Sequence, residues 1–202
     1  MRHRPAVGSL LVCLLLVACG SEAEDLAAAP QAARRVYFVP LGSFPKEEIQ
    51  RLVIHYSQRF KLQIETLGSV PIAATARNPA RRQLTAEELI AQMRRAFPKL
   101  AADPNAILIG LTSEDMYLRA RDWAFGFGLR SATAAVVSTA RMDLHYAGEP
   151  AAVANQETRL RKMITKDIGI LYYGLHQSDN PRSVLYSRIM GLEELDQVGE
   201  DF

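Results

Sequence analysis

The stretch AILIGL at residues 106–111 decides the fold of this chain, because it is the clearest strand in the sequence. It is continuous and apolar, which is typical of a strand in the middle of a sheet that helices cover on both faces. The run RVYFVPLG at residues 35–42 ends in Pro and Gly and predicts a second buried strand. Further strands are expected at residues 62–67, 122–127 and 134–139.

Helices are expected between these strands. Pro45 opens one of them, and apolar side chains then follow at helical spacing. Thr85 and Glu88 predict a capping box at the start of a second helix. A long helix is expected from Gln156 to Tyr173, and a short one near residues 192–198. The alternation of strands and helices predicts an α/β fold, a single compact domain in which helices pack on a mixed sheet.

The N-terminus has the features of an export signal. Arg2 and Arg4 precede a short apolar run that ends in LVACGS at residues 16–21, a pattern typical of secretory signal peptides. The run is shorter than the about 20 residues that a membrane-spanning helix needs. Because a cysteine follows Leu-Val-Ala, the segment resembles a bacterial lipobox, and this resemblance implies that Cys19 is lipidated. In the alternative, the peptide is a plain secretory signal and Cys19 has no such role.

This signal divides the chain into a signal peptide at residues 1–18, a tether at 19–34 and a folded domain at 35–202. Small and acidic residues dominate the tether and predict disorder. The mature protein is expected in the bacterial cell envelope, anchored through acyl chains on Cys19. Gly20, rather than Asp, follows the cysteine, which favours the outer membrane, facing the periplasm.

Charge and cysteine content exclude several classes of protein. Arg2 and Arg4 account for the formal net charge of +2, so the chain from Cys19 onward is neutral, and no nucleic-acid partner is expected. The cysteines are Cys13, inside the signal, and Cys19. The folded domain therefore has no thiol nucleophile, no disulfide and no cysteine metal ligand.

Four pieces of sequence carry a resemblance to a known family. They are VPLG at residues 39–42, LTSEDMY at 111–117, WAFGFG at 123–128 and AVVSTAR at 135–141. In their order and spacing they resemble the archaemetzincins, compact zinc peptidases of the metzincin kind. That family's pattern runs Val-Thr-Asp-x-Asp-Leu-Tyr, an aromatic-Phe-Gly strand, then Val-Val-Ser-x-x-Arg. The resemblance covers about residues 36–176 and implies a metzincin-like mixed sheet.

The resemblance also implies a zinc motif, H-E-x-x-H-x-x-G-x-x-H, on the long helix, with His ligands and a Glu general base. With Gly169 in the fourth place, Lys166 stands at the first His, Asp167 at the Glu, Ile170 at the second His and His176 at the third. One ligand of three remains, whereas a catalytic zinc needs three. Lys166 and Asp167 are therefore interpreted as exposed helix charges, and His176 as a residue at the helix end.

Three functions remain open for such a domain. The first is a non-catalytic pseudoprotease that binds a peptide or protein in the relic cleft, the groove in which the family's zinc motif would lie. The second is an active metallopeptidase of the archaemetzincin type with a non-standard site, although the spacing of His55 and His145 suggests no convergence with His176. The third is a structural envelope lipoprotein. The first is preferred, without enzymatic activity or cofactor, and its partners are membrane lipid, through acylated Cys19, and the peptide or protein ligand.

Cys19→Ser should release the protein from the membrane fraction or block its maturation, because it removes the sulfur that would carry the lipid. Metabolic labelling with a fatty acid, followed by membrane fractionation, checks this. Absence of label from the wild type, together with equal membrane recovery of both proteins, would exclude the lipid anchor.

Overall fold

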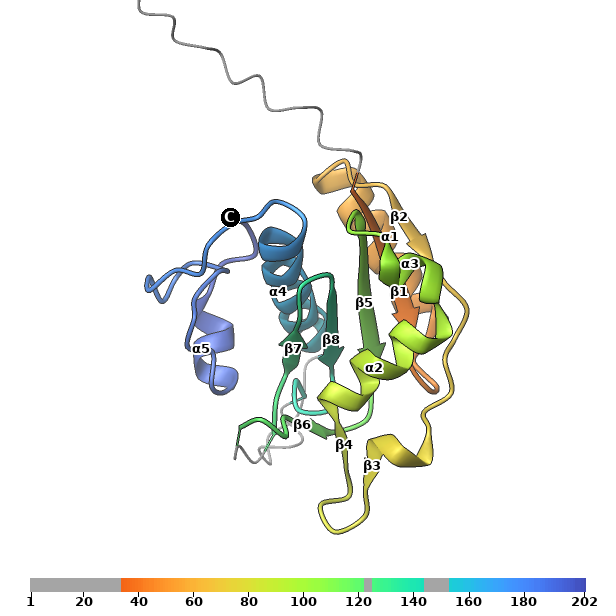
Figure 1. The fold of residues 1–202 in the computed structure, drawn as a ribbon. Coiled ribbons are helices and arrows are strands. Elements are labelled where there is room, and N and C mark those ends of the chain that lie inside the picture. The colour runs from red at the N-terminus through yellow and green to blue at the C-terminus, as the bar shows by residue number, and fades with distance from the viewer. Residues whose placement is uncertain (1–33, 122–124, 144–152) are drawn as a thin grey trace, which may run out of the picture. The chain divides into compact units, whose positions relative to one another are not determined.

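The fold is described from a computed structural model, in which residues 34–121, 125–143 and 153–202 are described. The expected signal peptide, almost all of the tether and Cys19 lie outside the described residues, as does His145. The described residues belong to one compact unit, drawn in Figure 1.

A five-stranded mixed sheet forms the centre of the domain, in the order β2-β1-β5-β8-β7. The first four strands in this order are parallel, and β7 runs antiparallel to β8 at the edge. The strands are β1 (Arg35–Pro40), β2 (Ile64–Thr66), β5 (Ala106–Thr112), β7 (Gly128–Arg130) and β8 (Ala134–Ser138). Every residue of β5 is buried, as its continuous apolar run predicts.

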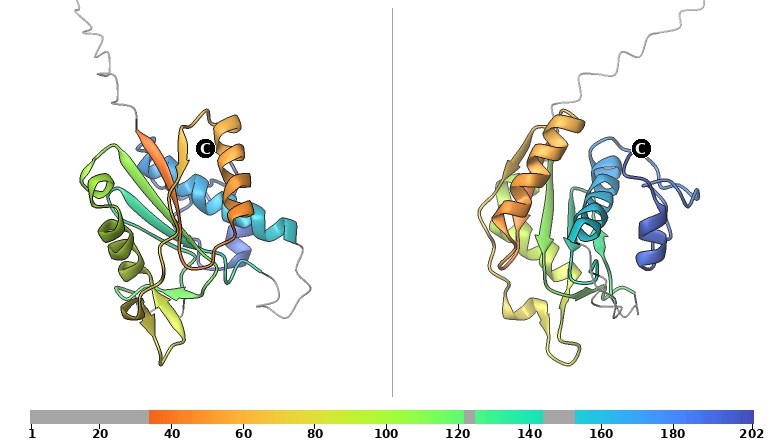
Figure 2. Two further views of the ribbon diagram at one scale, coloured as in Figure 1. Left: turned by 90° about the vertical axis from the view of Figure 1, so that its right-hand side faces the viewer. Right: turned by 180° about the vertical axis from the view of Figure 1, so that it is seen from behind.

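Helices cover both faces of this sheet, which confirms the predicted α/β fold (Figure 2). The helices α1 (Lys46–Arg59) and α4 (Val153–Leu171) pack with α5 (Leu192–Gln197) in the core on one face. The helix α2 (Ala86–Ala96) packs on the other face, followed by the short α3 (Pro98–Ala102). No helix within the described ranges combines the length and apolar character needed to cross a membrane.

A small second sheet joins the loops at one end of the domain. It has the order β3-β4-β6, from β3 (Arg77–Asn78), β4 (Gln83–Thr85) and β6 (Met116–Tyr117), and follows the short 3₁₀ helix η1 (Ala74–Ala76). Thr85 ends β4 and is the N-cap of α2, but its side chain makes no capping hydrogen bond. Its Oγ1 lies 3.2 Å from the Tyr117 hydroxyl instead. The predicted capping box is therefore wrong in its contacts, because β4–β6 pairing engages Thr85.

The strand expected at residues 122–127 is also wrong over its described part. Residues 122–124 lie outside the described residues, and residues 125–127 form no strand, since β7 begins at Gly128. The Gly126 N–H donates to the Met116 carbonyl at 3.0 Å. A Cβ at Gly126 would lie 2.1 Å from Cδ1 of Leu118, so this segment packs on the β6 loop instead of extending β7.

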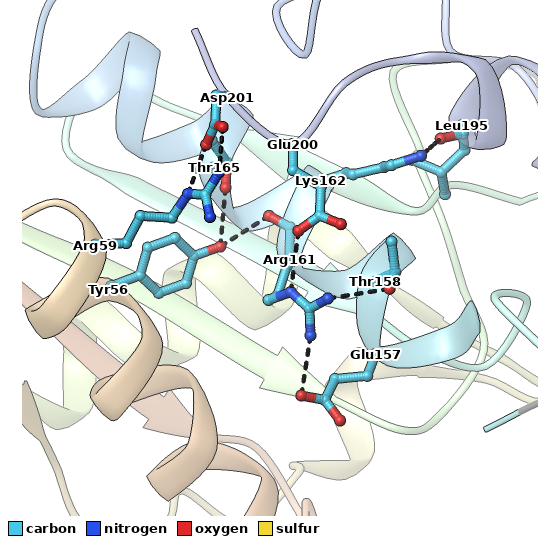
Figure 3. Close-up of polar contacts among 10 residues, drawn as sticks. All are labelled: Tyr56, Arg59, Glu157, Thr158, Arg161, Lys162, Thr165, Leu195, Glu200 and Asp201. Carbon is cyan, nitrogen blue, oxygen red and sulfur yellow. Dashed lines mark hydrogen bonds and ion pairs between the residues drawn. The ribbon is translucent and has the colours of Figure 1, made fainter. Parts of the chain in front are cut away.

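The C-terminal tail, defined here as residues 172–202, returns along α4 (Figures 1 and 2). Its last residues are tied to α1 and α4, as Figure 3 shows: Arg59 makes a two-pronged ion pair with Asp201, and Arg161 contacts Glu200 at 3.3 Å. The Phe202 ring lies 5.3 Å from that of Phe60, centroid to centroid. The tail is therefore an integral layer of the domain.

Tyr56 joins α1 to α4 from within the core. Its hydroxyl donates to the Arg161 carbonyl at 2.8 Å and lies 3.1 Å from Thr165 Oγ1. Burial raises the pKa of Tyr56, so the hydroxyl stays protonated and available as a donor. This contact ties α4 to α1.

Tyr56→Phe should lower the free energy of unfolding by about 1 kcal/mol, since it removes one buried hydrogen bond without a large change in volume. Chemical denaturation measures the change. Tyr37→Phe, in the core on the other face of the sheet, is the matched control and should have the smaller effect. An equal effect of both substitutions would contradict the role of the Tyr56 hydroxyl.

Candidate functional site

A cleft of about 600 Å³ lies along the edge strand β7, bordered by α4 and the C-terminal tail. Its walls combine apolar side chains with polar and charged ones. The apolar side chains are Leu118, Phe125, Phe127, Leu129, Met163, Ile189 and Met190, and the polar ones are Arg121, Arg130, Lys166, Gln177 and Ser187. A cavity of this size and character is typical of a ligand site.

Lys166 and Asp167 are buried, so the expectation of exposed helix charges is wrong. Lys166 is 4% exposed and Asp167 is 1% exposed. Every residue of α4 from Lys162 to Gly169 is buried, because the sheet covers one side of the helix and the tail covers the other. A Cβ at Gly169 would lie 2.7 Å from Phe202 Cε1, so glycine allows this close approach.

Asp167 is paired with the edge strand of the sheet. Arg130 Nη1 donates to Asp167 Oδ1 at 2.6 Å, whereas Oδ2 is buried and has no hydrogen-bond partner within the described residues. Burial raises the pKa of Asp167, and the Arg130 guanidinium opposes this shift. In the register expected from the sequence, the place of the family's general base therefore holds a carboxylate in an ion pair.

Lys166 binds the C-terminal tail. Its Nζ donates to the main-chain carbonyl of Tyr186. Burial lowers the pKa of Lys166 to about 8; Arg130 acts in the same direction, and the Asp167 carboxylate opposes it. The amine is therefore still mostly protonated at neutral pH, next to the cleft.

Lys166 is one of three buried cations on the same face of α4. Arg159 makes two hydrogen bonds to the Asp196 carboxylate, at 2.7 and 2.6 Å. Lys162 Nζ donates to two carbonyls in the last turn of α5, at 3.0 and 2.9 Å, one of which appears in Figure 3. Spacings of three and four residues align these side chains. They anchor the tail along α4, a role that the sequence analysis missed although the spacing signals a shared face.

The other relic positions do not complete a metal site. Ile170 is half-buried and has a hydrocarbon side chain, and His176 is exposed, five residues beyond the end of α4. His55 lies on α1 with its ring against Tyr56. No group of three or more His, Cys, Asp or Glu side chains that could hold a metal is found in the described part of the chain. An ammonium, a paired carboxylate and a hydrocarbon do not fit the ligand set of a catalytic zinc.

The sequence pieces at residues 111–117 and 135–141 meet in the structure. Arg141 donates to both carboxylate oxygens of Asp115, at 2.8 and 2.7 Å. Ser138 Oγ donates to the Glu114 carbonyl at 2.7 Å. These contacts hold the β6 loop on the end of β8, so these motif residues position the cleft walls. Ser138 is 2% exposed and is no candidate nucleophile.

The outer edge of β7 pairs with no other strand in the described part of the chain and offers backbone groups to the cleft. Two hydrogen bonds show which residues of β7 face β8. The Ser138 N–H donates to the Phe127 carbonyl at 2.9 Å, and the Ser131 N–H donates to the Ala134 carbonyl at 2.7 Å. In an antiparallel ladder every second residue points its N–H and C=O away from the partner strand. These residues are Gly128 and Arg130, and both line the cleft.

The fold and its cleft define a compact α/β domain of the kind found in zinc peptidases. No protein-family model matches the sequence. The chain is 27% identical over 155 residues to an archaemetzincin from Haloquadratum walsbyi, covering 74% of this chain and 84% of the relative. It is 26% identical over 162 residues to one from Pyrococcus furiosus, covering 75% and 79%.

Solved structures have the same fold. A zinc-dependent peptidase from Methanocorpusculum labreanum superposes with a TM-score of 0.68 at 22% identity, covering 83% of this chain and 95% of that one. The archaemetzincin from Archaeoglobus fulgidus, complexed with malonate, gives a TM-score of 0.65 at 19% identity, covering 83% and 94%. The domain is archaemetzincin-like in sequence and in fold, as the resemblance of its sequence pieces predicts.

Arg130→Met should lower the free energy of unfolding by about 3–5 kcal/mol, because it leaves the Asp167 carboxylate buried without its partner. Without Arg130 the pKa of Asp167 rises further above its value in the unfolded chain. The loss should therefore shrink as the pH falls from 7 through about 4 and below, where the carboxyl becomes neutral in the unfolded chain as well. Denaturation curves at several pH values measure both effects.

Two further variants control this experiment. Arg130→Met combined with Asp167→Asn should recover much of the loss, since no buried charge remains. Arg35→Met removes an exposed ion pair to Glu65 of 3.8 Å and should cost less than about 1 kcal/mol. A pH-independent loss in Arg130→Met would contradict the charge-based explanation.

Proposed function

We propose that this protein is a non-catalytic, archaemetzincin-like lipoprotein of the bacterial cell envelope that binds peptides or proteins in the cleft along β7. The observation that carries the proposal is the contrast within one site. The cleft and its edge strand are present. At the expected positions of the zinc motif, however, Lys166 and Asp167 are held in other contacts, and Ile170 has no atom that could bind zinc.

Within the described residues no set of suitable zinc ligands is found, which argues against peptide hydrolysis by the family's mechanism. A zinc peptidase needs a metal-bound water and a free general base. Asp167 is tied to Arg130, and the Lys166 ammonium would repel a divalent cation. No step of hydrolysis follows from these residues.

Peptide binding fits the rest of the cleft. An extended peptide can add a strand to an open sheet edge, with main-chain hydrogen bonds that give affinity and side-chain pockets that give specificity. Gly128 and Arg130 supply the edge, and the apolar walls supply the pockets. Ion pairs and hydrogen bonds fix the tail that forms one wall, so binding would require little ordering of the protein.

The membrane anchor belongs to the same proposal. An acylated Cys19 followed by a short tether would hold the domain near a membrane surface, on the periplasmic side of the outer membrane. Such a location suits the capture of peptides or exported proteins.

The wild-type protein should bind extended peptides and return them intact. A pool of random, N-acetylated octapeptides is incubated with the full-length protein, and bound and free peptides are sequenced by mass spectrometry. Zinc is measured in the same sample, and its content should lie well below one per chain. Peptide cleavage that a chelator stops would identify an active metallopeptidase with a non-standard site. Recovery of no peptide would favour a structural envelope lipoprotein.

A further inference from the structure

A cationic region distinguishes one part of the cleft from its apolar walls. Arg121, Arg130 and Lys166 line the cleft, and among its described lining residues none is acidic. The Asp167 carboxylate is held by Arg130, is 1% exposed and does not line the cleft. This ion pair largely neutralises Arg130, so the positive charge beside β7 rests mainly on the Lys166 ammonium, which suits an anionic group.

Lys166 can donate to a ligand in this region. An ammonium has three N–H donors, and the described residues show one acceptor for them, the Tyr186 carbonyl. The side chain forms no ion pair within the described part of the chain. Because it is 4% exposed, a hydrogen bond to an anion there would be little screened by water. Burial lowers the pKa of Lys166 to about 8, although the neighbouring Asp167 carboxylate, which Arg130 holds, opposes this shift.

We infer that the cleft recognises the C-terminal end of an extended peptide, with its carboxylate at Lys166 and Arg130 and its main chain along β7. The inference rests on the peptide-binding function proposed above and names the ligand class for it. The backbone groups of Gly128 and Arg130 pair with a peptide main chain. Arg130 is also the last residue of β7. A bound peptide that runs parallel to β7 therefore brings its C-terminal end to Arg130 and Lys166.

Other carriers of a carboxylate fit this arrangement less well. A fatty acid has no main-chain amides for the edge of β7 and would use the apolar walls alone. An acidic side chain within a peptide would have to reach the cations from a main chain already placed along the strand. The positive ammonium of a peptide N-terminus would be repelled by both cations.

The experiment compares each octapeptide selected from the pool as a free acid with the same peptide as a C-terminal amide, on the full-length protein. The free acid should bind at least about tenfold more tightly, as expected for a charge-assisted hydrogen bond. Lys166→Gln should reduce this ratio toward one, Lys166→Arg should restore much of it, and Lys99→Gln, at an exposed lysine of α3, should leave it unchanged. If Lys166→Gln does not fold, the comparison of acid and amide on the wild type still decides.

The outcomes separate this inference from the proposed function. Equal binding of acid and amide would overturn the carboxylate assignment and leave peptide binding intact. If an amidated peptide with an internal Asp or Glu binds as tightly as the free acid, the assignment of the carboxylate to the C-terminal end of the peptide would be overturned. If laurate binds as tightly as the selected octapeptides in their free-acid form, the identification of the ligand as a peptide would be overturned. Failure of every peptide to bind would overturn the proposed function itself.

Discussion

Burial of the charged face of α4 is the constraint on which the rest of the structure depends. Arg159, Lys162 and Lys166 lie inside the protein, and buried charges are tolerated only with partners. The C-terminal tail supplies these partners: the Asp196 carboxylate and main-chain carbonyls. The path of the tail is therefore fixed by the donors of α4, and with it one wall of the cleft.

The same geometry connects α4 to the elements on either side of it. In the motif H-E-x-x-H-x-x-G-x-x-H, a zinc ion would connect a helix to the segment that follows it, and metal binding contributes to folding free energy. In this chain Lys166 connects α4 to the tail through the Tyr186 carbonyl, and Asp167 connects α4 to β7 through Arg130. A hydrogen bond and an ion pair thus cross-link α4 to the tail and to β7.

The sequence was sufficient to predict the elements that depend on local patterns. Each of these patterns involves residues close together in the sequence: the apolar runs of β1 and β5 and the helical spacing of apolar residues in α4. The errors arose where distant segments meet. Lys166 and Asp167 were expected to be exposed because the period of α4 does not reveal the tail that covers its outer face. Thr85 engages Tyr117, more than thirty residues away, so a local capping rule failed.

The positions that resemble the family and those that depart from it have different physical roles. Asp115 and Arg141 hold the β6 loop on β8, and Ser138 strengthens the same joint. These residues act on the shape of the cleft. The departures fall on Lys166, Asp167 and Ile170, where the family's chemistry would lie. A fold persists when its packing and internal hydrogen bonds persist, whereas an activity depends on a few side chains in one site. In this chain the contacts of Asp115, Arg141 and Ser138 shape the cleft, whereas Lys166 and Asp167 connect α4 to the tail and to β7.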